Sequence, residues 1–234
     1  MSPLAPTVGV VQFPGSNDDR DAAWALAALG AEPVLVWHAE EELPSVGAVV
    51  LPGGFSYGDY LRAGAIARFA PIMRAVERFA AAGGPVLGIC NGFQILCEAG
   101  LLPGALRPNT SLSFVCTDVR LRVENADTLF TARCEEGQEL VVPVKHGDGC
   151  FYAPPELLTY LDAHGQIVLR YAAGENPNGS VADVAGICNT DGNVLGLMPH
   201  PEHAVDPLLG PADGALILAS LVDAARDRAF VAAR

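Results

Sequence analysis

Short apolar runs alternate with helical patterns through the first hundred residues, and this alternation limits the possible folds more than any other feature of the chain. Four runs rich in valine and leucine have the length of buried strands. The segments between them have helical spacing, and glycines end several of them. Such alternation predicts an α/β fold with a mostly parallel sheet and helices on both faces. The predicted strands are 8–13, 34–37, 48–51 and 86–89, and the predicted helices are 18–29, 66–82 and 93–99.

The second half of the chain has a different pattern. Two longer strands are predicted with no helix between them, and three further β runs follow before one closing helix. We expect an antiparallel extension together with strands that return to the main sheet. No repeat, low-complexity tract or linker is present, which predicts a single domain over residues 1–234. The predicted strands are 114–124, 139–144, 167–171, 184–189 and 194–198, and the predicted helix is 207–225.

Charge and composition narrow the range of partners and compartments. Acidic residues outnumber basic ones 27 to 14, and a formal net charge of −13 argues against nucleic acid as a partner. The six cysteines form no CxxC pair, which is typical of a reducing compartment. Residues 1–10 have no basic segment before their apolar stretch, and the apolar tract 216–222 is too short to span a membrane. We therefore expect a cytoplasmic protein without a membrane partner.

The most distinctive local motif is Gly88-Ile89-Cys90-Asn91-Gly92, between a predicted strand and a predicted helix. A G-x-nucleophile-x-G turn holds its central residue in a strained backbone conformation with the side chain exposed. A thiol at a helix N-terminus is favoured as the thiolate. Cys90 is thus a candidate nucleophile, although a buried cysteine at an ordinary glycine-rich turn would fit the local pattern as well.

A cysteine nucleophile needs a base, and Met198-Pro199-His200-Pro201-Glu202 offers one after a predicted strand. The two prolines stiffen the segment, so that imidazole and carboxylate can point in fixed directions. His200 would move the proton, and Glu202 would orient the imidazole ring of His200. The alternative is that Glu202 caps a helix and His200 is a loop residue.

A second glycine-rich strand end, 51–59, is expected at the same sheet edge as Cys90. Its backbone N–H groups, with that of Asn91, could form an oxyanion hole. Neither a GxGxxG nor a Walker motif is present, so phosphate binding is disfavoured, while a plain turn stays open. His146, among glycines after a strand, could also line a site. No group of residues has convincing metal spacing, and no metal is predicted.

Taken together, residues 88–94 and 198–202 resemble class I (triad-type) glutamine amidotransferases. Within that class they look like the glutaminase subunits of phosphoribosylformylglycinamidine synthase, an enzyme of purine biosynthesis. The resemblance runs from about Val8 to the last helix. Further matching segments are 13–17, 52–64, 109–114 and 176–180.

The resemblance implies a flavodoxin-like fold and a glutaminase with the triad Cys90, His200 and Glu202. Cys90 would form a glutamyl thioester and release ammonia. A separate synthetase subunit, with a small third subunit as a further possible partner, would use this ammonia, ATP and Mg to aminate formylglycinamide ribonucleotide. This chain would itself bind no cofactor. The resemblance assigns the oxyanion hole to Gly54 and Asn91, and substrate binding to Gln94, Gly53, Asn109, Ser111, Phe114 and His146.

Four positions depart from the pattern of that family. Asp18 stands where a cysteine is common and His203 where an arginine is common, and Lys145 and Asp148 lie in a segment usually written Ala-His-Gly-Glu-Gly. We expect none of them to touch the triad, and we expect any effect at the partner-facing surface. Two other functions stay open: a hydrolase with the same elbow and water as acceptor, and an inactive interaction module.

Overall fold

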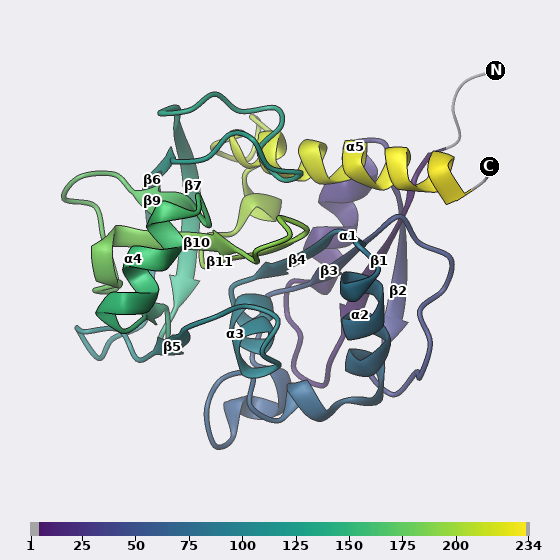
Figure 1. The fold of residues 1–234 in the computed structure, drawn as a ribbon, viewed down its shortest axis with the longest axis horizontal. Helices are drawn as coiled ribbons and strands as arrows, with labels where there is room; N and C mark the ends of the chain where they lie inside the picture. The colour runs from purple at the N-terminus through teal and green to yellow at the C-terminus, as the bar shows by residue number, and fades with distance from the viewer. Residues whose placement is uncertain (1–4, 233–234) are drawn as a thin grey trace.

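A nine-stranded sheet runs through the molecule in the order β2-β1-β3-β4-β11-β10-β9-β6-β7 (Figure 1). The computed structural model describes residues 5–232. Strands β1 to β4 and β11 pair in parallel, and β10, β9, β6 and β7 continue the sheet in antiparallel fashion. The strands are β1 (Thr7–Gln12), β2 (Glu32–Trp37), β3 (Ala48–Leu51), β4 (Val86–Ile89), β6 (Val115–Val123), β7 (Glu139–His146), β9 (Ile167–Tyr171), β10 (Val184–Cys188) and β11 (Val194–Leu197).

Helices cover both faces of the parallel strands. Helices α1 and α5 pack against each other on one face, and α2 and α3 lie on the other (Figure 1). Strands β3, β4 and β11 are buried along their whole length, as expected for a sheet covered on both sides. The helices are α1 (Asp19–Ala28), α2 (Pro71–Ala81), α3 (Asn91–Glu98), α4 (Pro155–Ala163) and α5 (Gly214–Ala232).

This architecture confirms the predicted α/β class, the parallel first half and the antiparallel extension. Strand β11 is the returning strand, since it pairs with β4 at the centre of the sheet. That pairing matters for function because the Cys90 turn follows β4 and the His200 segment follows β11. A small antiparallel pair, β5 (Ala105–Arg107) and β8 (Cys150–Tyr152), was not predicted.

Two predicted helices had wrong bounds, and one helix was not predicted. The predicted helix 66–82 is broken: residues 67–69 form a 3₁₀ turn, and α2 starts at Pro71, which fits the first turn of a helix. The closing helix begins at Gly214 and not at residue 207, because Pro207, Gly210 and Pro211 favour turns. Helix α4 was missed, although Pro155 at its start is a recognised signal.

Two expectations extend beyond the described part of the chain. The single domain 1–234 includes residues 1–4 and 233–234, and the segment 1–10 without a secretory signal includes residues 1–4. The one-domain assignment stays a prediction, with a single main sheet joining the two halves. Among the helices of residues 5–232, none combines the length and the apolar character that crossing a membrane requires.

Candidate active site

Cys90 occupies the sharp turn between β4 and α3. Its backbone has φ 49° and ψ −102°, a conformation that residues with a side chain rarely adopt. The glycines permit this turn: a Cβ atom on Gly92 would lie 2.0 Å from the carbonyl oxygen of Leu51, and one on Gly88 would lie 2.7 Å from that of Gly92. The Cys90 N–H donates to the Leu197 carbonyl at 2.8 Å. The turn therefore fixes the thiol at the ends of two adjacent parallel strands.

We expected the Cys90 side chain to be exposed, but the residue is only 5% accessible. The elbow points into a cavity that loops cover, and Sγ lies 3.8 Å from the carbonyl oxygen of Lys145. Cys97, on the same helix, packs against the core, and burial raises the pKa of its thiol. Cys90, before α3, and Cys97, within it, thus have different environments, and Cys90 alone of the two lines the cavity.

His200 and Glu202 lie directly after β11, where residues Pro201–His203 form a 3₁₀ turn. The His200 N–H donates to the Pro143 carbonyl at 2.8 Å, which anchors the segment to β7. Nδ1 of His200 lies 2.6 Å from Oε1 of Glu202, and both side chains are fully buried. Glu202 therefore orients the imidazole, and its carboxylate is used there and not as a helix cap.

The bond to Glu202 leaves Nε2 of His200 for proton transfer. This atom is buried and makes no hydrogen bond within the described residues. Burial by itself would lower the pKa of His200, but the charge of Glu202, followed by that of the Cys90 thiolate, outweighs it, so that the pKa is raised. The arrangement favours the imidazolium form of His200, which can donate a proton from Nε2.

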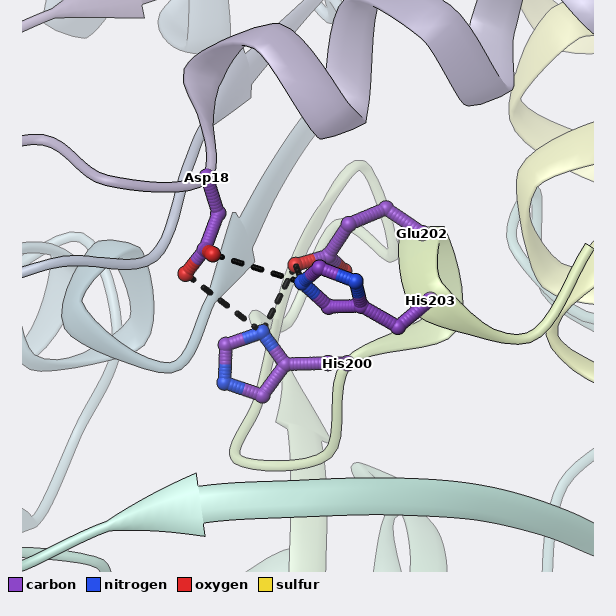
Figure 2. Close-up of side chains that lie close together, drawn as sticks. All are labelled: Asp18, His200, Glu202 and His203. Atoms are coloured by element: carbon purple, nitrogen blue, oxygen red, sulfur yellow. Dashed lines mark hydrogen bonds and ion pairs between the residues drawn. The ribbon is translucent and has the colours of Figure 1, made fainter. Parts of the chain in front are cut away.

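Asp18 contacts His200, His203 lies near Glu202 and the Lys145 carbonyl lies near the Cys90 thiol, so the expectation that the four departures avoid the triad was wrong for these three. Oδ2 of Asp18 lies 3.7 Å from Nδ1 of His200 (Figure 2), and Oδ1 binds the Lys145 ammonium. Nε2 of His203 lies 3.3 Å from Oδ1 of Asp18. Asp148 lines the cavity. The physical reason is that α1 and β7 both pack against the 3₁₀ turn that follows β11.

The glycine-rich strand end lies against the same histidine. A Cβ atom on Gly53 would lie 2.7 Å from Cε1 of His200 and 2.4 Å from Oδ2 of Asp18, so glycine is required there for the imidazole to fit. Gly54 has φ +145°, which favours glycine, and pairs with Ser16 across an antiparallel bridge.

The Asn91 side chain connects this loop to the elbow. Its Oδ1 accepts the Ser56 N–H at 3.1 Å, and its Nδ2 donates to Oδ1 of Asp59 at 3.3 Å and to Oε1 of Gln94 at 2.8 Å. Gln94 in turn donates to the Asp148 carbonyl at 2.7 Å. The backbone N–H of Asn91 is in the first turn of α3, where no intrahelical acceptor exists.

A cavity of about 230 Å³ opens beside the thiol. Among the predicted site residues, Cys90, Gly54, Gln94, Phe114 and His146 line it, whereas His200, Glu202, Gly53, Asn91, Asn109 and Ser111 do not. The other lining residues are Asn17, Asp18, Phe55, Asp59, Lys145, Gly147 and Asp148.

Asn109 and His146 belong to a buried network at the cavity wall, where His146 is a lining residue and Asn109 is not. The Asn109 amide donates to the carbonyls of Ser113 and His146, at 2.9 Å each. Nδ1 of His146 lies 3.2 Å from Oδ1 of Asn109, and Nε2 lies 3.4 Å from Nδ2 of Asn178. Burial lowers the pKa of His146 to about 4, so its ring is neutral. Asn109 thus holds the loops that form the cavity wall, while Ser111 is exposed.

Comparison with known proteins agrees with this geometry. Residues 5–213 match the CobB/CobQ-like glutamine amidotransferase domain family. This chain belongs to the glutamine amidotransferases.

Relatives of this amidotransferase extend over nearly its whole length. A Frankia casuarinae protein named phosphoribosylformylglycinamidine synthase subunit PurQ is 60% identical over 216 residues, which are 92% of each chain. A protein of the same name from Rubrobacter xylanophilus is 60% identical over 219 residues, covering 94% of this chain and 99% of that one. A chain in the structure of PurLQS from Thermotoga maritima superposes with a TM-score of 0.86 at 44% identity, covering 94% of this chain and 98% of that one.

Several residues of the amidotransferase site were not found as candidates from the sequence. Asp59 was noticed only as part of a loop, yet it lies in the cavity wall, where burial and then the charge of Asp148 raise its pKa to about 6. Phe55 and Asn17 line the cavity as well. Their position in the two matching segments was the available signal, but no local pattern distinguishes a wall residue from a turn residue.

One cluster in this amidotransferase has spacing that could suit a metal ion. Ligand atoms of Asp18, His200, Glu202 and His203 lie within 4.8 Å of one another. However, the Lys145 ammonium already binds Asp18, and Nδ1 of His200 bonds Glu202. We assign no metal to this cluster, and the absence of a metal stays a prediction.

Proposed function

We propose that this chain is the glutaminase subunit of a phosphoribosylformylglycinamidine synthase. It would hydrolyse glutamine and supply ammonia to a synthetase subunit that converts formylglycinamide ribonucleotide to formylglycinamidine ribonucleotide. The main support is one observation: a cysteine in a strained elbow lines a cavity after β4, and a buried histidine–glutamate pair follows the adjacent parallel strand β11. The two relatives named PurQ, with 60% identity over most of the chain, select this member of the family.

In the proposed reaction, the Cys90 thiolate attacks the carboxamide carbon of glutamine, and a C–S bond and a tetrahedral oxyanion form. The His200 imidazolium donates its Nε2 proton to the departing nitrogen as the C–N bond breaks and ammonia leaves. Water then attacks the thioester while His200 accepts a proton. The C–S bond breaks, and glutamate and the thiolate are regenerated. The Nδ1 bond to Glu202 keeps the ring oriented in both steps.

Gly54 and Asn91 are the proposed donors to the oxyanion. The Asn91 N–H is free of an intrahelical acceptor because of its position in the first turn of α3. Gly54 lines the cavity and has a backbone conformation that a side chain would prevent. Removing one such donor typically reduces transition-state stabilisation by roughly 2.7–4 kcal/mol. Gln94, Gly53, Phe114, His146 and the loop that contains Asn109 and Ser111 remain the proposed substrate-binding elements.

The remaining expectations about partners belong to this proposal. This chain would contain no cofactor, and ATP and Mg would act on the synthetase subunit. The similarity to a chain of PurLQS supports an assembly with such a subunit. A small third subunit, a cytoplasmic location and the absence of a nucleic-acid partner complete the proposal, the last because of the net charge of −13.

The decisive experiment compares two nitrogen sources in the purified complex with the synthetase. Cys90→Ala should abolish amination supported by glutamine and preserve amination supported by ammonium, because only the first requires the thiol. Amination from glutamine by the Cys90→Ala complex would contradict the mechanism. Turnover of esters or peptides without glutamine consumption would instead favour the alternative hydrolase.

The pairing of His200 and Glu202 is tested in the same assay. His200→Ala and Glu202→Gln should each reduce glutamine turnover, the histidine change more severely, because the histidine moves the proton and the carboxylate orients it. Residues that act as one unit are strongly non-additive, so the double variant should be little worse than His200→Ala. Losses that multiply would show that the two act independently.

A further inference from the structure

Asp18 places a second carboxylate beside His200, on the same edge of the ring as Glu202 (Figure 2). Oδ2 of Asp18 is 3.7 Å from Nδ1 of His200, and Oε1 of Glu202 is 2.6 Å from the same nitrogen. Nδ1 bears part of the positive charge of the imidazolium. Two anions therefore face the nitrogen that is not used for proton transfer.

Asp18 is at the N-cap position of α1, and capping would be the ordinary reason for an aspartate there. Its side chain makes no capping hydrogen bond, however. The carboxylate instead points away from the helix to His200, His203 and Lys145, and its side chain is only 4% exposed. The position of Asp18 is thus used for contacts with the site and not for the helix end.

The carboxylate of Asp18 is ionised at neutral pH. Burial would raise its pKa, but the hydrogen bond from His203, the charge of His200 and the contact with Lys145 outweigh burial, so that the pKa is held well below its usual value. Lys145 projects from β7, and His203 follows the β11 end.

One further acid, Asp21, belongs to the surroundings of this cluster. Oδ2 of Asp21 on α1 is 3.9 Å from Nε2 of His203, with a side chain that is 51% exposed, and Oε1 of Glu202 is 3.6 Å from the same nitrogen. Asp21 is thus the outer acid of the group and makes no contact with His200.

We propose that Asp18 is a positioning residue which, together with Glu202, stabilises the imidazolium form of His200, and that Lys145 is the counter-ion which limits this effect. The inference rests on the proposed roles of Cys90 and His200. Lys145 is well placed for this because it binds the oxygen of Asp18 that does not face His200. Without that ammonium, the full charge of Asp18 would act on the ring.

This arrangement predicts that substitutions of Asp18 and Lys145 shift the pKa of His200 in opposite directions. Replacing Asp18 by asparagine removes an anion from the imidazolium and leaves the Lys145 cation nearby, so His200 should lose its proton more readily. Replacing Lys145 by methionine removes a cation and leaves Asp18 uncompensated, so His200 should hold its proton more strongly. Damage to packing alone would not produce opposite shifts.

The test is an NMR titration of the ring nitrogens in the full chain labelled with ¹⁵N-histidine, with the His200 signals assigned by a His200→Gln variant. We expect Asp18→Asn to lower the pKa of His200 by about 1 unit, the lower end of the effect of a charge at this distance. Lys145→Met should raise it. Asp21→Asn, an exposed acid of the same helix that contacts only His203, should leave it unchanged.

An unchanged pKa in Asp18→Asn, or shifts of the same sign in Asp18→Asn and Lys145→Met, would overturn the proposal. If Asp18→Asn does not fold, Lys145→Met decides alone, because only a raised pKa agrees with the counter-ion role. The titration needs no glutamine. A chain without glutaminase activity would therefore refute the proposed function separately, and the effect of Asp18 on the ring would still be measured.

Discussion

At the scale of single residues, the site depends on a backbone conformation that its central residue does not favour. Cys90 has positive φ without being glycine, and such strain commonly costs about 1–3 kcal/mol. Backbone contacts on both sides maintain it, since Gly88 and Gly92 allow neighbouring carbonyls to approach and the Cys90 N–H is bonded to Leu197. This strained backbone directs the thiol into the cavity. The strain should lower the free energy of unfolding by a measurable amount.

Replacing Cys90 by glycine should therefore stabilise the fold relative to alanine. Glycine relieves the strain of about 1–3 kcal/mol and loses about 0.5–1 kcal/mol through chain entropy, which leaves a gain of about 1 kcal/mol. The measurement is the free energy of unfolding in urea for Cys90→Gly and Cys90→Ala. Both variants lack the nucleophile, so activity does not enter the comparison. Equal stabilities would mean that the elbow stores no strain.

At the scale of elements, the loop after β3 is the part of the site with the most unusual backbone. Tyr57, Asp59 and Leu61 all have positive φ although none is glycine. The Asn91 amide fixes Ser56 and Asp59 to the elbow through two hydrogen bonds. This loop therefore depends on α3 for its shape, and a change at either end should affect the other.

Gly53→Ala should disable the site while the fold persists. The added methyl would meet Cε1 of His200 at 2.7 Å and Oδ2 of Asp18 at 2.4 Å, so the imidazole must move. Because a displacement of about 1 Å can reduce a rate about 10²-fold, we expect a loss of that size in glutamine turnover. Gly9→Ala in β1 is the matched control, since its methyl would find ordinary contacts at 3.6 Å or more. Similar losses in both variants would refute the steric explanation.

The charge of Asp59 should make the fold less stable as the pH rises from about 4 to about 6. Burial, then the charge of Asp148, raises the pKa of Asp59 from 3.8 to about 6. The folded chain thus binds this proton more tightly than the unfolded chain, so stability falls as pH rises through this interval. The free energy of unfolding of Asp59→Asn should exceed that of the unsubstituted chain by about 1 kcal/mol at pH 8, a value reduced because Asp59 is partly exposed. This difference should disappear at pH 4.

The control for this titration is Asp118→Asn, because Asp118 is exposed on β6. Thermal unfolding of the three proteins at the two pH values is sufficient. An advantage of Asp59→Asn that is the same at both pH values would show that packing and not charge is responsible.

At the scale of the whole molecule, the mouth of the site is unusually apolar. Phe55 and Phe114 line the cavity and are 47% and 55% exposed, and Tyr60 and Leu61, further along the same loop as Phe55, are 75% and 89% exposed. Large exposed apolar groups around a site are typical of a surface that another protein covers. The strained loop lies at this surface, so docking there can change its conformation.

We predict that the isolated chain hydrolyses glutamine slowly and that the synthetase with its substrates strongly stimulates it. Docking would favour the competent conformation of the loop, and the gain is limited by the partner's differential affinity for the two states. The measurement is glutamate release by the lone chain and by the complex. Glutamine should also support amination at a far lower concentration than ammonium. A lone chain as fast as the complex would refute the gating, but not the triad.

The sequence by itself determined the elements and the reacting residues. Strand runs, the glycines around Cys90 and the prolines around His200 act through local dihedral preferences and periodicity, which are present in the chain before it folds. The triad candidates and the parallel half of the sheet could be predicted for that reason. Helix α4 was missed, although Pro155 and the apolar residues 157, 158 and 161 would have supported it.

Only the tertiary structure decided what surrounds the triad. Asp18 binds Lys145 from 127 positions away and His203 from 185 positions away, and no local pattern relates these residues. Asn109 has a polar side chain that could bind a substrate, but its hydrogen bonds hold the loops of the cavity wall in place. Such roles depend on which strand ends become neighbours when β11 inserts beside β4. Distances and burial arise from that packing, so they exist only once the sheet has formed.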